Sequence, residues 1–158
     1  MGYTLKIGEL ETATTDDGLE SIVLNDAKDE HHENAPAFGD PTDHTNSRWP
    51  SYSGWADVCR LTGLSEFFFN KGTGLIRQHP GCFPLKKEHK EIIDKAYDEF
   101  YKKYPNAKPG YSPRVDDIKV FEDNEWPEEN AIAVRLEWLK YWVDWALINC
   151  KQPVFVNS

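Results

Sequence analysis

The sequence has little of what marks secreted, membrane-spanning or disulfide-rich proteins. Its three cysteines, Cys59, Cys82 and Cys150, are an odd number at wide spacing and form no Cys-x-x-Cys pair. This favours reduced thiols in a reducing compartment over a disulfide framework. No apolar run approaches the roughly 20 residues that span a bilayer, and residues 1–8 lack the apolar stretch of a secretory signal. We therefore expect a cytoplasmic protein without membrane association.

Motifs of nucleotide-binding and hydrolytic enzymes are also absent. GxGxxG, GxSxG and HExxH do not occur, and residues 71–74 (Lys-Gly-Thr-Gly) are too short for a phosphate-binding loop. His79 and Cys82 have the spacing of half a zinc site or of a Cys/His nucleophilic pair. No second half of a zinc site follows, and Pro80-Gly81 favours a tight turn instead. We expect neither a cofactor nor a resident metal.

Positive charge is scarce in the first third of the chain. Residues 1–47 hold eleven acidic residues against two lysines, whereas residues 48–158 carry both signs equally, and the whole chain has a formal net charge of −9. Because neutralised phosphates supply most of the affinity for nucleic acids and anionic membranes, this pattern predicts no direct binding to either. The acidic third is either a solvated edge, a protein-interaction surface or a mimic of nucleic acid.

The composition, 39% hydrophobic and 13% aromatic over 158 residues, is typical of a single globular domain spanning 1–158. Alternating apolar residues at 3–10 and a short apolar run at 21–24 flank a turn signal at 14–18, which predicts an antiparallel hairpin. Residues 26–48 show no periodicity and are rich in Asp, His, Pro and Asn. They predict a long, irregular acidic loop.

Two long and one or two short helices are expected. Apolar residues repeat at helical spacing over 85–104. A largely apolar helix opens at Trp126-Pro127 and runs to about Asn149. Because apolar residues occur on most of its sides, we expect it to be the central helix of the core. A shorter helix is predicted over 51–62, with Gly63 as its stop, and the Phe-rich stretch after Ser65 forms a helical turn or a strand end.

Short strands complete the predicted fold. Ile118, Val120 and Phe121 indicate one, and residues 154–156 are expected to return as an edge strand to the N-terminal hairpin. The predicted class is α+β, with a small antiparallel sheet packed against the helices.

The segment 37–52 has the highest density of reactive side chains. Asp43 beside His44 has the composition of a carboxylate that orients a general base, and Asp40, Asp43 and His44 offer oxygen and nitrogen ligands to a divalent metal. The same residues are typical of ordinary turns, in which short polar side chains bond the local backbone. The turn is the simpler interpretation.

Arginine and aromatic residues follow in the same segment. Arg48, Trp49, Tyr52 and Trp55 combine a guanidinium with aromatic faces, as in sites that grip a phosphate and stack a base. Tyr111 and Arg114 form a second such loop. The alternative is that the aromatic residues pack a helix onto the core while Arg48 covers an edge.

The remaining histidines have plainer interpretations. His31 and His32 lie among acidic residues in a predicted loop and are expected to be solvated. His89 lies on the apolar face of the predicted helix 85–104, where we expect a hydrogen-bonded core histidine.

Residues 36–43, 49–52, 79–82 and 138–142 resemble small uncharacterised accessory proteins encoded by tailed bacteriophages. The resemblance covers most of the chain but brings no assigned activity, cofactor or catalytic residue. It implies a soluble accessory protein inside an infected bacterium, a setting in which small binders of host proteins are common.

The leading hypothesis is a non-catalytic binding protein. Its loops around 44–55 and 110–114 would hold a small polar, nucleotide-like ligand or a host protein. A second hypothesis is a small hydrolase or transferase in which His44 or His79 acts as base, supported by Asp43 or Asp40. A third is an acidic protein-interaction or nucleic-acid-mimic protein, whose binding would weaken with salt.

Overall fold

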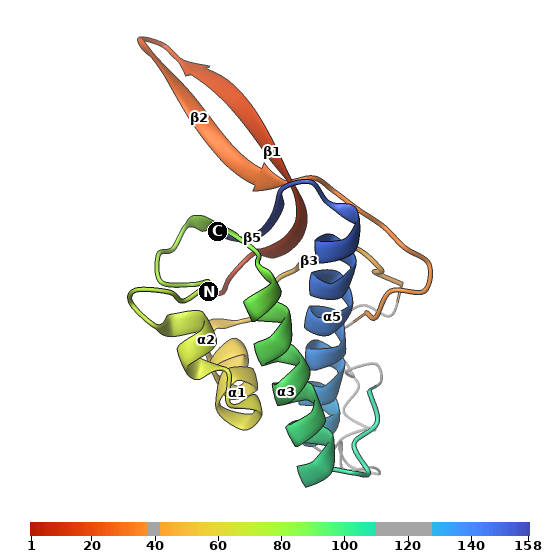
Figure 1. Cartoon of the computed structure of the whole chain (residues 1–158). Helices are drawn as coiled ribbons and strands as arrows, with labels where there is room; N and C mark the ends of the chain where they lie inside the picture. Colours follow the sequence, from red (N-terminus) through yellow and green to blue (C-terminus); the bar gives the residue numbers. More distant parts are fainter. Residues whose placement is uncertain (38–41, 110–127) are drawn as a thin grey trace.

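A long, bent strand organises the sheet (Figure 1). The computed structural model describes residues 1–37, 42–109 and 128–158. Strand β1 (Leu5–Asp17) pairs antiparallel with β5 (Pro153–Asn157) along its first part and with β2 (Glu20–Ala27) along the rest. Strand β4 (Gly81–Pro84) pairs with β5, so the order is β2-β1-β5-β4. The short β3 (Ser47–Arg48) pairs with the start of β1.

The N-terminal hairpin is confirmed, but its strands are longer than the predicted 3–10 and 21–24. The prediction of a turn at 14–18 is wrong, because residues 14–17 belong to β1 and the turn lies at Gly18-Leu19. The two strands meet at a tight turn in which Gly18 has a φ of 78° and Leu19 has no positive φ, the pattern of a type II′ turn. Residues 11–17 were missed because a strand with no buried face shows no apolar alternation. The hairpin beyond Leu10 and Ala27 projects from the body (Figure 1), and we call residues 11–26 the arm.

The C-terminal strand lies inside the sheet, and the prediction of an edge strand is wrong. Strand β5 has β1 on one side and β4 on the other. Its residues Val154, Phe155 and Val156 are buried on both faces, as expected of a central strand. The predicted turn at 79–82 enters β4 at Gly81. This strand was missed because only its pairing with β5 defines so short a segment.

The four described helices are α1 (Tyr52–Thr62), α2 (Ser65–Phe69), α3 (Lys87–Lys103) and α5 (Glu128–Asn149). Both predicted ends of α1 are confirmed. Ser51 Oγ accepts a hydrogen bond from the Gly54 amide at 3.0 Å, and Gly63 ends the helix with a φ of 72°. Trp126-Pro127 and the predicted strand at 118–121 lie outside the described residues.

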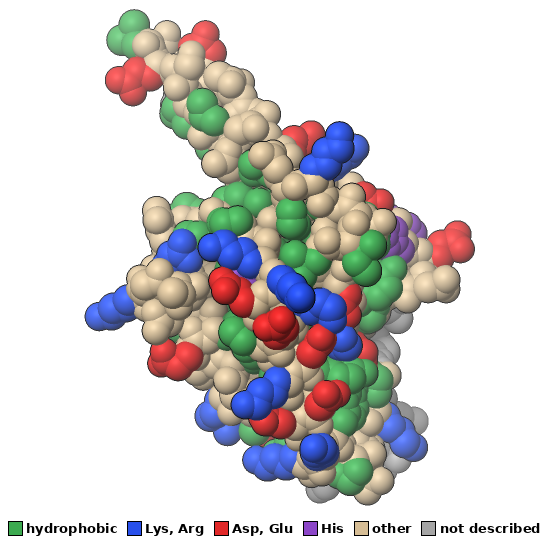
Figure 2. Space-filling model, viewed as in Figure 1, with side chains coloured by type: hydrophobic (Ala, Val, Ile, Leu, Met, Phe, Trp, Pro, Cys, Tyr) green, Lys and Arg blue, Asp and Glu red, His purple; other side chains and the backbone are tan. Residues whose placement is uncertain are grey.

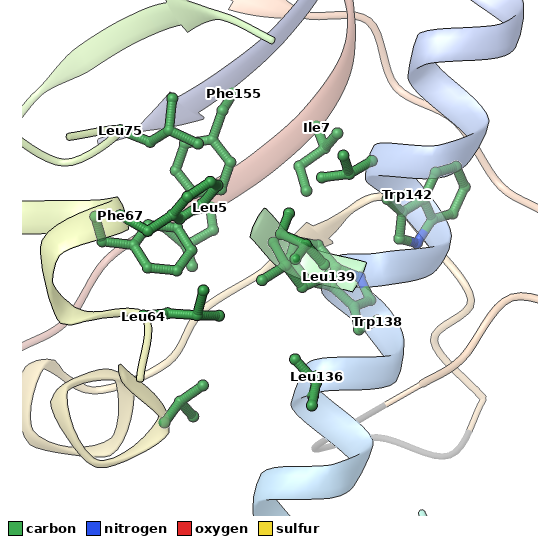
Figure 3. Packing of buried hydrophobic residues seen from close by; sticks show 14 of the residues in the cluster. Leu5, Ile7, Leu64, Phe67, Leu75, Leu136, Trp138, Leu139, Trp142 and Phe155 are labelled. Carbon is green, nitrogen blue, oxygen red and sulfur yellow. The ribbon is translucent and has the colours of Figure 1, made fainter. Parts of the chain in front are cut away.

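The core forms where one face of the sheet meets the helices (Figure 3). Leu5, Ile7 and Phe155 from the strands pack in one cluster with Trp138 and Trp142 of α5. Helix α5 is buried on most sides, which confirms the predicted central helix. The α+β class is therefore confirmed. In the described part of the chain, no helix combines the length and apolar character needed to cross a bilayer.

Candidate functional site

The segment 42–52 is held together by bonds within itself and to the neighbouring loop. Asp43 Oδ1 accepts hydrogen bonds from the amide and the hydroxyl of Thr45, at 3.0 and 2.6 Å. His44 Nδ1 donates to the carbonyl of Ala35 at 2.7 Å. Asp43 and His44 therefore do not form the predicted carboxylate–imidazole pair, and Asp43 has the local backbone bond of an ordinary turn.

A metal site has no support in the residues that the structure covers. No group of three or more His, Cys, Asp or Glu side chains able to hold a metal ion is found among them. Asp40, the third predicted ligand beside Asp43 and His44, lies outside these residues.

Arg48 holds this segment together through hydrogen bonds and an ion pair. Its side chain is 2% exposed, and its guanidinium donates to the carbonyls of Thr45 and Pro36, at 3.1 and 3.3 Å, and to the carbonyl of Asp43. It also lies 3.1 Å from the Asp43 carboxylate. Because Arg48 is enclosed and bonded to the protein itself, it offers no accessible guanidinium to a phosphate.

The aromatic residues of this region separate into interior and surface. Trp55 is fully buried against Phe68, whereas Trp49 is 63% exposed and Tyr52 is 37% exposed. Tyr111 and Arg114 lie outside the described residues. The structure therefore does not bring Arg48, Trp49, Tyr52 and Trp55 together on one accessible surface.

Trp49 borders an open cavity of about 310 Å³ with an acidic rim. Asp29 and Glu30 line it together with His31 and the polar residues Thr45, Asn46 and Ser47. Asp29 pairs with Lys6 at 2.5 Å and Glu30 bonds His32 at 3.2 Å. The lining residues include no lysine or arginine, so this cavity offers no cationic side chain to a nucleotide phosphate.

A second polar cluster links His79 to Asn157, a residue that the sequence analysis missed. His79 Nδ1 lies 2.7 Å from Asn157 Oδ1, and Tyr52 Oη lies 3.3 Å from His79 Nε2. Tyr3 packs edge-on against both rings. An amide therefore orients His79, in place of the predicted Asp43 or Asp40. Nothing local marks Asn157, because its partner lies 78 residues away.

His32 also differs from its prediction. It is not solvated but packs on α5, with its ring 4.7 Å from Trp142 and 5.0 Å from Trp145. Its ring nitrogens bond Tyr141 at 2.8 Å and Glu30 at 3.2 Å. His31 is exposed, as predicted.

His89 is half-buried rather than fully inside the core. Its Nδ1 accepts a hydrogen bond from the Lys86 amide at 2.9 Å and so caps α3. Burial lowers its pKa below the ordinary histidine value.

The arm is the most exposed element of the described chain (Figures 1 and 2). Strand β2 is exposed along its length except for Ala27, and its apolar side chains Ile22, Val23 and Leu24 lie largely in solvent, with Leu19 at the tip. Residues 11–26 include five acidic residues and no lysine or arginine. Apolar and acidic groups therefore share one projecting surface.

A hollow lies between the base of the arm and β4. It consists of two recesses of about 380 and 620 Å³, which share Asn25 of β2 and Cys82 of β4. Val154 lines the smaller recess and Val156 the larger one. Burial and the nearby Asp26 carboxylate raise the pKa of Cys82.

No protein-family model matches the chain, and no curated protein or solved structure matches it either.

Proposed function

We propose that this protein is a non-catalytic binding protein that engages a basic partner protein through the arm. The observation that carries the proposal is the exposure of Ile22, Val23 and Leu24 on a projecting edge strand. Exposed edge strands invite pairing, and proteins commonly blunt them with lysine, proline or a covering segment. Strand β2 has no lysine or proline. Such a surface is typical of a protein-interaction site.

Charge determines the kind of partner. Residues 11–26 hold five acidic residues and no basic one. Asp26 at the base of the arm pairs with Lys6 of β1, 3.5 Å away, so the acidic residues nearer the tip supply most of the attraction for a basic surface. Pairing of two arms edge to edge would bring ten acidic residues together. A basic partner is therefore favoured over a second copy of this chain.

The other hypotheses have weaker support. A nucleotide-like ligand needs an accessible cation, but Arg48 is enclosed and Trp49 borders carboxylates. A hydrolase based on Asp43 and His44 needs a pair that the two residues do not form. A nucleic-acid mimic is a special case of the proposal, in which the basic partner is an enzyme that binds DNA or RNA. The resemblance to phage accessory proteins makes a cytoplasmic host protein the expected partner.

The test compares two charge variants of equal size. One replaces three exposed acids of the arm, Glu11→Gln, Asp16→Asn and Glu20→Gln. The control replaces three exposed acids of α3, Glu91→Gln, Asp98→Asn and Glu99→Gln. Each variant is immobilised, exposed to bacterial lysate, and its bound proteins are quantified by mass spectrometry.

We expect a partner that the wild type and the α3 control retain equally. The arm variant should lose it by about tenfold or more, and high salt should release it, because the attraction is electrostatic. Equal retention by the arm variant would contradict the proposal. A bound small molecule of a few hundred daltons in native mass spectra, with no protein partner, would favour the ligand-binding hypothesis.

A further inference from the structure

We propose that the hollow between β2 and β4 receives an extended segment of the basic partner, which adds as a strand to β2. This inference rests on the proposed function and specifies how the partner is bound. It concerns a surface separate from the acidic cavity at Trp49 and from the His79 cluster.

The floor of the hollow is an apolar sheet face that the helices do not cover. Val154 and Val156 on this face are nearly enclosed by Ala27 and Leu10 at the base of the arm, and Cys82 beside them is half-buried. In the strand register Cys82 lies opposite Val156, and Pro84 lies opposite Val154, so these four residues point to one face. Phe83 and Phe155 point to the other face, into the helical core. Val154 and Val156 form a small second cluster with Ala27, to which Leu10 and Cys82 add their side chains.

The walls of the hollow are the two end strands of the sheet. Val23, Leu24, Asn25 and Asp26 of β2 line the larger recess on one side, and Gly81, Cys82 and Phe83 of β4 line it on the other. Strand β2 pairs with β1, and β4 pairs with β5; within the described residues neither has a second strand neighbour. The sheet therefore curls around a space bounded by strands whose outer backbone groups are available for pairing.

The shape favours a strand over a compact ligand. The two recesses share Asn25 and Cys82 in their linings, and the residues that line them extend from Val23 in the arm to Gln152 beside β5. An added strand presents alternate side chains to the floor, while its backbone bonds the free edge of β2. Of the two edges, β2 is the better template, because it has eight residues and no proline, whereas β4 has four and includes Pro84.

The charge of the arm sets the composition of the occupant. Alternate residues that face Val156 and Cys82 should be apolar, and the residues between them should be lysine or arginine, opposite the acidic side chains of the arm. The occupant is thus an extended peptide segment of alternating apolar and basic residues.

Cys82 allows occupancy of the floor to be measured directly. It lines both recesses, whereas Cys59 is buried in the helical core, where burial raises its pKa to about 12. In a Cys150→Ser variant, a maleimide therefore reports on Cys82. The probe is the blocked peptide Lys-Val-Lys-Val-Lys-Val-Lys. Its controls are the same peptide with N-methylated valines, which cannot donate strand hydrogen bonds, and a peptide with glutamate in place of lysine.

We expect the lysine peptide to slow alkylation of Cys82 by about tenfold or more at saturation, because a covered thiol reacts only when the strand leaves. The N-methylated and glutamate peptides should leave the rate unchanged. Combining Glu11→Gln, Asp16→Asn and Glu20→Gln should weaken binding of the lysine peptide.

Three outcomes would overturn the inference. First, the arm substitutions could weaken peptide binding while the bound peptide leaves Cys82 unprotected. The arm would then bind the peptide outside the hollow, which would reject this inference and leave the proposed function supported. Protection of Cys82 that rises with protein concentration, without peptide, would assign the hollow to a second copy of this chain. Absence of binding at millimolar peptide would reject strand addition, while lysate capture tests the arm independently.

Discussion

His79 donates its Nδ1 proton to Asn157 Oδ1, 2.7 Å away, and this bond joins the loop before β4 to the end of β5. The amide orientation follows from its other contact, because Asn157 Nδ2 donates to the carbonyl of Leu75 at 3.2 Å. With its proton on Nδ1, His79 presents Nε2 as an acceptor to the Tyr52 hydroxyl. One fully buried asparagine thereby connects β5, the loop before β4 and α1.

Replacing Asn157 with Leu should destabilise the protein. The substitution removes both hydrogen bonds of the amide and leaves the buried Leu75 carbonyl without this donor, at a cost of about 2 kcal/mol in the free energy of unfolding. Urea denaturation followed by tryptophan fluorescence measures the change. Since His79 is exposed and can bond water instead, His79→Ala should cost less. A variant Asn157→Leu as stable as the wild type would show that this network is not needed for folding.

Arg48 and Trp49 are neighbours in sequence but should respond oppositely to substitution. Arg48→Met leaves several carbonyls and the Asp43 carboxylate without their donor, so we expect a loss of about 3 kcal/mol or more. Trp49→Ala removes a mostly exposed ring and should change stability by only about 0.5 kcal/mol. Thermal and urea unfolding of the two variants provide the comparison. Equal losses in the free energy of unfolding for the two variants would contradict the prediction, because Trp49 would then contribute as much to stability as the enclosed Arg48.

Stability should fall at alkaline pH through two tyrosines. Tyr97 and Tyr101 both donate to Glu137 Oε1, at 2.7 and 2.8 Å. Burial, helped by these bonds, raises the pKa of Tyr97 from 10.0 to about 12 and raises that of Tyr101 as well. Because the unfolded chain loses these protons first, their contribution is complete below pH 10 and decreases as the pH rises through the folded pKa values.

The measurement is the urea midpoint from neutral pH to beyond pH 11 or so, for the wild type and for Tyr97→Phe combined with Tyr101→Phe. The wild-type midpoint should drop more steeply above about pH 10 than that of the double variant, which lacks both titrating groups. Parallel curves would exclude these tyrosines as the cause.

Local patterns carried enough information for α1, α3 and α5 and for the presence of the hairpin, but not for the full length of its strands. Ser51 and Gly63 mark the ends of α1 because capping depends on a side chain and a backbone angle within the same turn. The apolar spacing of α3 and the all-round apolar surface of α5 likewise reflect burial of successive turns. The acidic composition of residues 11–26 can also be read directly from the sequence.

The chain alone determined α1, α3 and α5, the presence of the hairpin and the charge pattern, since each depends on residues within a few positions of one another. Only the tertiary structure decided that β4 pairs with β5, that Asn157 orients His79, and that Arg48 faces inward while Trp49 faces out. These features join segments far apart in sequence, and their energies come from pairing, burial and hydrogen bonds that no local pattern contains. The projection of the arm belongs to the same group, because exposure depends on what the rest of the chain leaves uncovered.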